Sequence, residues 1–506
     1  MKKNLLLLAS TALLTLSVKS QGFDIKINFK GCKDTLAYLV SYNFGQTGIV
    51  DTCKNIKNGQ IEFKGKRTLE KGVYTLVSEG KSIYFDFFIN ENQKFAMSTD
   101  NADIIGNLKV TGNKENEQFF SYLKYITSKN QEVGKLLEQT KGKSKEDSAK
   151  FMNEKIKQLN DDVKKFDKDF MEKAKGTFVY DVLNLKTEKV APEIPKAKNG
   201  RPDSVYQYYY YKSHYFDGIN FKDERIVRNQ FLDVRIKKYF DNVILMHPDT
   251  IIHEIDKILA KCDENNLVYN TLVVYFAYKY EQSKIMGFDK IFVDVADKYI
   301  ISGKAKGAYT PETVAKIKER VDIMRNLLLD AKVSDLYMID TTNGRAVRKM
   351  GFDTAKTGKS ITDLYYKNVD KLTPMFKTLY SVNAKYTLLV FWAADCGHCQ
   401  TEVPKLHEDL KAIKSTIDYK VFAVQTKDEL YNDWKKFIID KKLNDFIHVY
   451  DPVHINNLKD RFDIYSTPVI YILDKDKKIK AKRIGAEQVV DMLKNLEAID
   501  KANTKK

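Results

Sequence analysis

Three patterns of apolar and polar positions follow one another along the 506 residues of the chain. From residue 21 to about 112, apolar and polar residues alternate in short runs such as 23–29, with turn signals between the runs. Between 113 and 331 the apolar positions recur at helical spacing. From 332 to 498 short apolar runs alternate with helical stretches. We therefore expect a multidomain α+β protein, with a small β-sandwich, a central α-helical domain and an α/β sandwich with a mixed sheet.

The third pattern is regular enough to predict individual elements. Residues 386–392 are almost all apolar and rich in β-branched and aromatic side chains, which is typical of a strand covered on both faces. Residues 336–340 predict a strand, with a hairpin turn at 341–344. The other expected elements are helices at 396–414, 428–441, 454–461 and 487–497, and strands at 419–425, 468–474 and 479–484.

The two ends of the chain predict export and a short tail. Lys2 and Lys3 precede an apolar run at 5–16 that is too short to span a bilayer. Small residues follow, so we expect a secretory signal peptide at 1–20 with cleavage after Ser20. The alternative is an uncleaved membrane anchor. We expect an exported, periplasmic protein with no stable membrane span in its mature part. Residues 499–506 are predicted to form a basic tail.

Charge and cysteine usage limit the function classes. The 85 basic and 68 acidic residues give a formal charge of +17, but the lysines are scattered among acids, which indicates a solvated surface and no nucleic-acid partner. Export to an oxidising space makes the five cysteines informative. Cys32 and Cys53 flank a predicted hairpin in an offset register, and their pairing stays open. Cys262 ends a helical pattern and is expected to be buried as a small apolar residue.

The remaining two cysteines carry the chemistry. Cys396 follows the strand at 386–392 and stands where the next helix begins, so unpaired N–H groups and the helix dipole favour its thiolate. Cys399 lies three residues later on the same helix face. It is therefore placed to attack a mixed disulfide formed on Cys396.

The segment Trp392-Ala-Ala-Asp-Cys-Gly-His-Cys399 resembles the redox motif of the thioredoxin superfamily. Thr467 and Pro468, which open a later apolar strand, resemble the cis-proline loop of that family. Glu402 and Pro404 resemble the Glu-x-Pro pattern of the exported TlpA/ResA-like branch. The resemblance covers residues 332–498 and implies a thioredoxin-like fold and thiol-disulfide exchange.

The same resemblance implies roles for the neighbours of the cysteines. His398 would stabilise the Cys396 thiolate and contact substrate, whereas the carboxylate of Asp395 would oppose that thiolate. Thr467 and Pro468 would offer backbone groups to an extended substrate. The buried aspartate of thioredoxin is replaced here by Val390, and Glu402 would take its place as general acid and base, buried with a raised pKa. His398 as a spacer and Glu402 as a solvated helix residue are the alternatives.

Two further segments resemble uncharacterised modules found before thioredoxin domains in exported bacterial proteins. In the β-rich part the matching residues include Gly59 with Phe63 and the run 72–74, and in the helical part they are 221–225 and 247–249. Residues 206–217 mix aromatics with Gln, Lys and His. They could stack on a ligand, but packing among helices with exposed hydroxyls is the favoured interpretation.

No metal or cofactor is expected. One C-x-x-C supplies two zinc ligands, and His407 lies too far along the helix to complete the set. Haem attachment would need histidine where Gln400 stands. We expect a thiol-disulfide oxidoreductase acting as reductase or exchange enzyme, with disulfide-bearing or dithiol protein partners and an upstream electron donor. The alternative is a non-enzymatic binding protein in which Cys396 and Cys399 form a structural disulfide.

Overall fold

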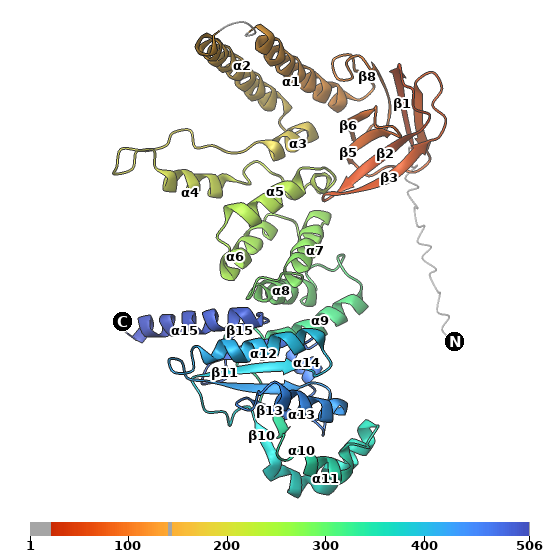
Figure 1. Cartoon of the computed structure of the whole chain (residues 1–506). Coiled ribbons are helices and arrows are strands. Elements are labelled where there is room, and N and C mark those ends of the chain that lie inside the picture. Colours follow the sequence, from red (N-terminus) through yellow and green to blue (C-terminus); the bar gives the residue numbers. More distant parts are fainter. Residues whose placement is uncertain (1–21, 140–143, 505–506) are drawn as a thin grey trace, which may run out of the picture. The chain divides into compact units, whose positions relative to one another are not determined.

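The computed structural model of the chain describes residues 22–139 and 144–504 (Figure 1). The signal peptide predicted at 1–20 therefore lies outside the described residues, as do the last two residues of the predicted tail. Within the described ranges, no helix combines the length and the apolar character needed to cross a membrane.

The chain divides into two compact units, and the helical segment predicted as one domain contributes to both. The first unit holds the chain up to Met246, and the second unit runs from Leu272 to the C-terminus. Between them, residues 247–257 belong to the second unit and residues 258–271 to the first. The predicted domain boundaries stay predictions.

The first unit begins with two four-stranded sheets, in the orders β4-β1-β7-β8 and β3-β2-β5-β6. β1 buries every second side chain, as its alternating pattern predicted. Phe87 of one sheet and Phe95 of the other lie with ring centroids 6.0 Å apart, so the sheets pack face to face and the predicted sandwich is confirmed. The strands are β1 Phe23–Lys30, β2 Ala37–Asn43, β3 Gln46–Cys53, β4 Gln60–Gly65, β5 Gly72–Ser78, β6 Tyr84–Ile89, β7 Lys94–Asp100 and β8 Lys109–Thr111.

The helices begin where the spacing of apolar residues changes from the alternating pattern of strands to the helical pattern. The Asn113 side chain accepts a hydrogen bond from the Asn116 N–H at 3.0 Å and so caps the first helix. Tyr125 and Phe166 stack with centroids 3.7 Å apart, so the apolar stripes of the two long helices face each other. The helices up to residue 325 are α1 Lys114–Gln139, α2 Lys145–Ala174, α3 Phe178–Lys186, α4 Ser204–His214, η1 Glu224–Val227, α5 Leu232–Lys238, η2 Tyr239–Val243, α6 Pro248–Leu259, α7 Leu267–Glu281, α8 Asp289–Val295, η3 Ala296–Ile301 and α9 Pro311–Arg325.

The tyrosine-rich helix α4 departs from the expected packing. None of its residues is buried, and Tyr209 is 62% exposed. The helix is held at its start by the Asp203 side chain, which accepts hydrogen bonds from the N–H groups of Val205 and Tyr206. The helical period was therefore predicted correctly. The predicted packing holds at the end of the aromatic run, where Tyr215 is buried against Tyr239, but it fails for the residues of α4 itself.

The second unit contains a mixed seven-stranded sheet in the order β10-β9-β13-β12-β11-β14-β15. Every residue of the central strand β11 is buried, because helices cover both faces of the sheet. The strand pairs in parallel with β12 and antiparallel with β14, which confirms the predicted mixed sheet. The strands are β9 Tyr337–Asp340, β10 Phe376–Thr378, β11 Tyr386–Trp392, β12 Tyr419–Gln425, β13 Ile447–Tyr450, β14 Val469–Leu473 and β15 Ile479–Lys482.

Alternate residues of β11 build two separate cores. Val390 and Trp392 pack into a cluster with the helix that carries the cysteines, whereas Phe391 faces a second cluster on the other side of the sheet. Leu327, just after α9, is buried in this second cluster, so the helical segment covers part of the sheet. The helices here are α10 Gly344–Val347, η4 Arg348–Phe352, α11 Gly358–Leu372, η5 Thr373–Met375, α12 Gly397–Lys411, η6 Asp428–Leu430, α13 Tyr431–Asp440, α14 Leu458–Phe462, η7 Ala486–Gln488 and α15 Val489–Thr504.

One local prediction in this part was wrong. No hairpin forms at 341–344: the Asp340 side chain accepts hydrogen bonds from the N–H groups of Thr342 and Asn343, and the chain enters α10. The partner of β9 is β10, which the chain reaches only after these helices. At the C-terminal end, α15 continues to Thr504, so the described part of the predicted basic tail is helical.

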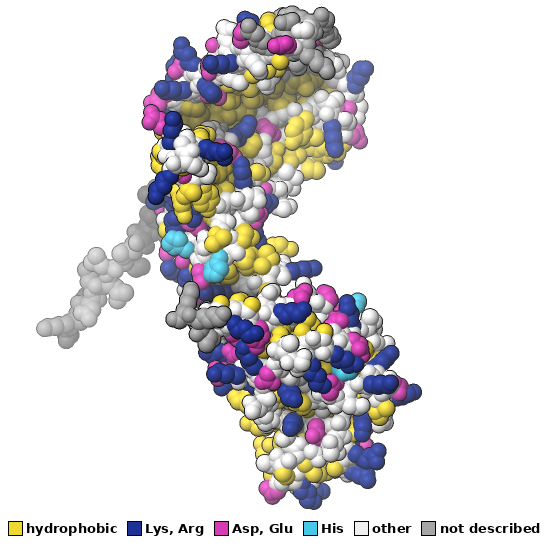
Figure 2. All heavy atoms as spheres, turned by 60° about the vertical axis from the view of Figure 1, so that its left-hand side comes forward, with side chains coloured by type: hydrophobic (Ala, Val, Ile, Leu, Met, Phe, Trp, Pro, Cys, Tyr) yellow, Lys and Arg dark blue, Asp and Glu magenta, His cyan; other side chains and the backbone are white. Residues whose placement is uncertain are grey.

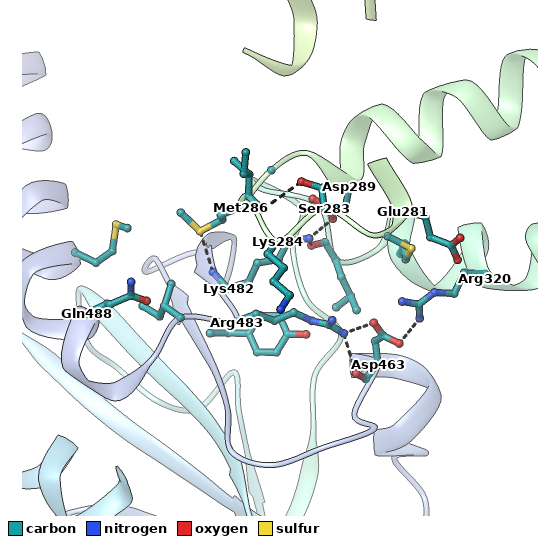
Figure 3. A pocket seen from close by; sticks show the side chains of 17 residues that line it. Glu281, Ser283, Lys284, Met286, Asp289, Arg320, Asp463, Lys482, Arg483 and Gln488 are labelled. Atoms are coloured by element: carbon teal, nitrogen blue, oxygen red, sulfur yellow. Dashed lines mark hydrogen bonds and ion pairs between the residues drawn. The ribbon is translucent and has the colours of Figure 1, made fainter. Parts of the chain in front are cut away.

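A buried carboxylate connects α9 to the sheet domain. Asp463 follows α14, is 4% exposed and takes the left-handed conformation with φ 55°. Its carboxylate pairs with Arg320 of α9 and with Arg483, which follows β15 (Figure 3). Arg483 also donates to the Asp463 carbonyl at 3.0 Å. Because two guanidinium groups hold this buried carboxylate, the backbone between α14 and β14 is fixed in place at Asp463.

Asp463→Asn tests this junction, since asparagine also tolerates the left-handed conformation and the change removes only the charge. We expect a loss of unfolding free energy on the order of 3 kcal/mol, because two guanidinium groups lose their carboxylate. Both tryptophans, Trp392 and Trp434, are buried in this domain, so tryptophan fluorescence during urea unfolding reports on it.

The matched control is Asp460→Asn, an exposed position on α14, where a change within about 0.5 kcal/mol is expected. If the two variants have the same free energy of unfolding, the negative charge of Asp463 does not stabilise the domain.

Candidate active site

The thiol of Cys396 lies at the junction of β11 and α12. Cys396 is the N-cap of α12, and its sulfur accepts a hydrogen bond from the Cys399 N–H at 3.4 Å. Its own N–H donates to the Ala393 carbonyl at 3.2 Å, which closes the turn from strand to helix. The short loop therefore presents Cys396 half-exposed at the start of the helix, where the dipole favours a negative charge.

A second segment reaches the same sulfur from far along the chain. The peptide bond between Thr467 and Pro468 is cis, and it lies directly before β14, the antiparallel neighbour of β11. The Cys396 thiol donates to the Thr467 carbonyl at 3.2 Å across a separation of 71 residues. The sheet register thus brings together the cysteines and the Thr-Pro pair, which the sequence predicted only as separate motifs.

The two thiols differ in environment and in acidity. Burial raises the pKa of Cys396, but hydrogen bonds from Cys399, Thr467 and the backbone of the helix start outweigh it and hold the pKa below its ordinary value. Cys399 is fully buried, and burial, together with the neighbouring Cys396, raises its pKa to about 12. Both are free thiols in the structure. Cys396 is therefore the more readily ionised thiol.

The predicted neighbours of the thiols take different positions. His398 is exposed at the start of α12. Asp395 is paired with Lys427, Oδ2 to Nζ at 2.6 Å, so its negative charge is partly balanced. Glu402 is half-buried rather than buried as expected, whereas Val390 is fully buried.

Lys427 was not predicted from the sequence. It stands two residues after β12, and β12 runs parallel to β11, so both strands end at the same edge of the sheet. The rule that functional groups gather beyond the carboxyl ends of parallel strands could have indicated it. Gln425, the last residue of β12, is also buried next to Trp392, and among the described residues neither of its amide atoms has a hydrogen-bond partner.

The other cysteines and the histidine of α12 lie apart from this chemistry. Cys32 and Cys53 are free thiols, and Cys53 stands opposite Ala37 in the register of β2 and β3. Cys262 is buried, as expected. His407 is held by Asp445, Nε2 to Oδ1 at 2.6 Å. Across residues 22–139 and 144–504, no cluster of three or more His, Cys, Asp or Glu side chains could hold a metal ion.

Family models match three successive parts of the chain. The model of the AhpC/TSA family matches residues 358–482. Two models, each described as a domain of unknown function, match residues 23–119 (DUF4369) and 137–326 (DUF5106). No curated protein matches the chain.

A solved structure supplies the deciding likeness. It is described as a domain of a possible thiol-disulfide isomerase from Cytophaga hutchinsonii, and it is 36% identical over 97% of its own length and 35% of this chain, with a TM-score of 0.26. The chain belongs to the thioredoxin superfamily. The assignment rests on the sequence identity and on the family model, and it confirms the resemblance expected from the motifs.

Two more solved structures are similar at lower identity. A thioredoxin-like protein from Bacteroides caccae is 16% identical, with 60% of this chain and 99% of that chain covered and a TM-score of 0.41. The thioredoxin domain of a thiol-disulfide oxidoreductase from Bacteroides vulgatus is 20% identical, with 34% and 97% covered and a TM-score of 0.25. The two models that match residues 23–119 and 137–326 show that this thioredoxin-superfamily chain carries extra N-terminal modules before its thioredoxin-like domain.

Alkylation of the reduced protein tests the difference between the two thiols. Because the pKa of Cys396 is lowered, its thiolate persists to lower pH than that of an ordinary cysteine, whose pKa is about 8.5. We expect iodoacetamide at pH 6 to 7 to modify Cys396 first. The rate should rise with pH through the lowered pKa and level off above it. Peptide mass mapping at several pH values measures this.

In the control variant Cys396→Ser, the buried Cys399 should stay unmodified over the same pH range. Modification of Cys399 before Cys396, or a midpoint for Cys396 at or above that of an ordinary cysteine, would contradict the geometry described here.

Proposed function

We propose that the chain is an exported, periplasmic thiol-disulfide oxidoreductase that acts as a reductase or exchange enzyme on protein partners. The observation that carries the proposal is the Cys396 sulfur, half-exposed and hydrogen-bonded by the helix start and by Thr467, with Cys399 buried behind it. An accessible thiol of low pKa beside a protected one is what thiol-disulfide exchange requires.

The first step uses the thiolate of Cys396. It attacks one sulfur of a partner disulfide, a new S–S bond forms to Cys396, and the other partner sulfur leaves as a thiolate that takes up a proton. The Thr467 carbonyl and the backbone around Pro468 face this sulfur and are the proposed contacts for an extended partner segment. His398, exposed beside the sulfur, is the proposed side-chain contact.

The second step releases the partner. Cys399 loses its proton, and its sulfur attacks Cys396; the partner's second sulfur leaves as a thiol, and the Cys396–Cys399 disulfide remains. Two electrons have passed to the partner. Because burial raises the pKa of Cys399 to about 12, a base must take its proton. Glu402, half-buried on α12 three residues after Cys399, is the proposed acid and base.

The cycle closes when an upstream dithiol donor reduces the Cys396–Cys399 disulfide by the reverse exchange. Asp395 opposes the thiolate of Cys396, but the pairing with Lys427 reduces its effect. The proposed enzyme therefore needs protein partners and an electron donor, and no bound cofactor takes part in the exchange.

Trapping of mixed disulfides tests the proposal directly. Cys399→Ser keeps the attacking thiol and removes the resolving thiol, so the full chain should accumulate a dithiothreitol-sensitive adduct with insulin chains. Cys396→Ser is the matched control and should form none. The wild-type chain should accelerate insulin reduction by dithiothreitol by about tenfold or more, and Cys396→Ser should return the rate to the uncatalysed value.

If neither variant traps insulin, or if Cys396→Ser traps it as well as Cys399→Ser, the enzyme proposal fails. The alternative, a binding protein whose Cys396–Cys399 pair is a structural disulfide, would then take its place.

A further inference from the structure

A cavity lies within the second unit, and its lining does not include the cysteines. It has a volume of about 540 Å³ and is lined by the loop between α7 and α8, by α9, by Asp463 and by the chain that follows β15 (Figure 3). None of Cys396, Cys399, Thr467 or Pro468 lines it. Cavities of roughly 300 to 1,000 Å³ are the size of small-molecule sites.

The apolar part of the lining is adaptable. Met286, Met324 and Met492 come from three different segments and converge on the cavity, with Leu327 and Ile484 between them. Methionine is unbranched and polarizable, so it adjusts to the shape of an apolar group. This part of the cavity suits an aliphatic or aromatic body.

The buried charges of the lining are already satisfied within the protein. The carboxylate of Asp463 is held between Arg320 and Arg483, which reach it from opposite sides in Figure 3. Lys482 is buried and pairs with Asp289, and it also donates to the Leu327 carbonyl. These groups form the polar floor of the cavity and do not depend on a ligand.

Among the accessible side chains that line the cavity, positive charges outnumber negative ones. Lys284 is exposed, points toward the sheet domain in Figure 3 and has no ion-pair partner among the described residues. The Arg483 side chain is 49% exposed and shares its carboxylate with Arg320. Glu281 is the one lining carboxylate that forms no ion pair among the described residues, and it stands beside Arg320 in Figure 3. The lining cations are Lys284, Arg320, Lys482 and Arg483, and the lining anions are Glu281, Asp289 and Asp463.

Figure 2 shows Lys and Arg side chains intermingled with Asp and Glu over the face it presents. Lys284 and Arg483 belong to this mixed surface, but both also line the cavity with its three methionines.

We propose that this cavity binds a small amphipathic monoanion, a carboxylate or sulfonate with an aliphatic or aromatic body. The acid group lies between Lys284 and the exposed part of the Arg483 guanidinium, whose Nη2 already donates to Asp463. The body packs against the methionines. This site is independent of the proposed redox function, because its residues take no part in the exchange.

The test uses 8-anilinonaphthalene-1-sulfonate, an aromatic monoanion, titrated into the full chain and followed by its fluorescence. Dodecanoate and dodecyltrimethylammonium, which carry the same tail and opposite charges, are then used to displace it. We expect dodecanoate to displace the probe and the cation to be at least about tenfold weaker, a difference of about 1.4 kcal/mol.

Lys284→Glu should weaken binding of both anions by about tenfold, and it is an exposed position where the fold is kept. Lys475→Glu, an exposed lysine in the turn after β14 that does not line the cavity, is the matched control and should change affinity less than twofold. Equal displacement by the cation, an unchanged affinity in Lys284→Glu, or no saturable binding of the sulfonate would overturn the proposal.

Discussion

The hydrogen bonds that converge on the Cys396 sulfur are the interaction on which the rest of the site depends. One comes from the start of α12, which follows β11, and the other contact is the Thr467 carbonyl just before β14. These two segments meet only because β11 and β14 are antiparallel neighbours, with Phe391 opposite Val469. The acidity of the thiol depends on this sheet register as well as on the motif, because the Thr467 side chain is one of the groups that lower the pKa of Cys396.

The thioredoxin-like domain is also not independent of the helical segment before it. Leu327 is buried against one face of the sheet, and Arg320 of α9 shares the Asp463 carboxylate with Arg483. Asp463 stands four residues before Thr467 in the chain. A contact made by the helical segment thus fixes the start of the loop that faces Cys396, and the same junction forms the floor of the proposed anion site.

The sequence predicted those features that depend on local pattern. The apolar run gave β11 and β12 with their observed bounds, and the turn from strand to helix placed Cys396 at the helix start. The sequence did not predict the features that depend on pairing between distant parts of the chain. The turn residues at 341–344 predict a hairpin, but the Asp340 side chain accepts a hydrogen bond from Asn343 where the chain enters α10, and β9 pairs with β10, much later in the chain. Lys427 and Arg320 reach their carboxylates across the fold, which no local pattern shows.

Glu402 and α4 show a different limit. A motif match predicts how residues are spaced along the chain, but the exposure of a side chain depends on what packs over it. Glu402 is half-buried, although we expected it to be buried. Likewise, the aromatic residues of α4 suggested packing, yet the helix carries no buried residue. Composition alone does not distinguish an aromatic face that is covered from one that is left open.

The central claim is that Cys396 and Cys399 form a redox-active pair in the folded domain. The most direct test is their equilibrium with a glutathione buffer, followed by quantifying free thiols in the full chain with Cys396→Ser as reference. The account predicts reversible oxidation at a potential between roughly −270 and −180 mV, the range from thioredoxin to disulfide isomerase. A pair that cannot be reduced without unfolding the domain would contradict it.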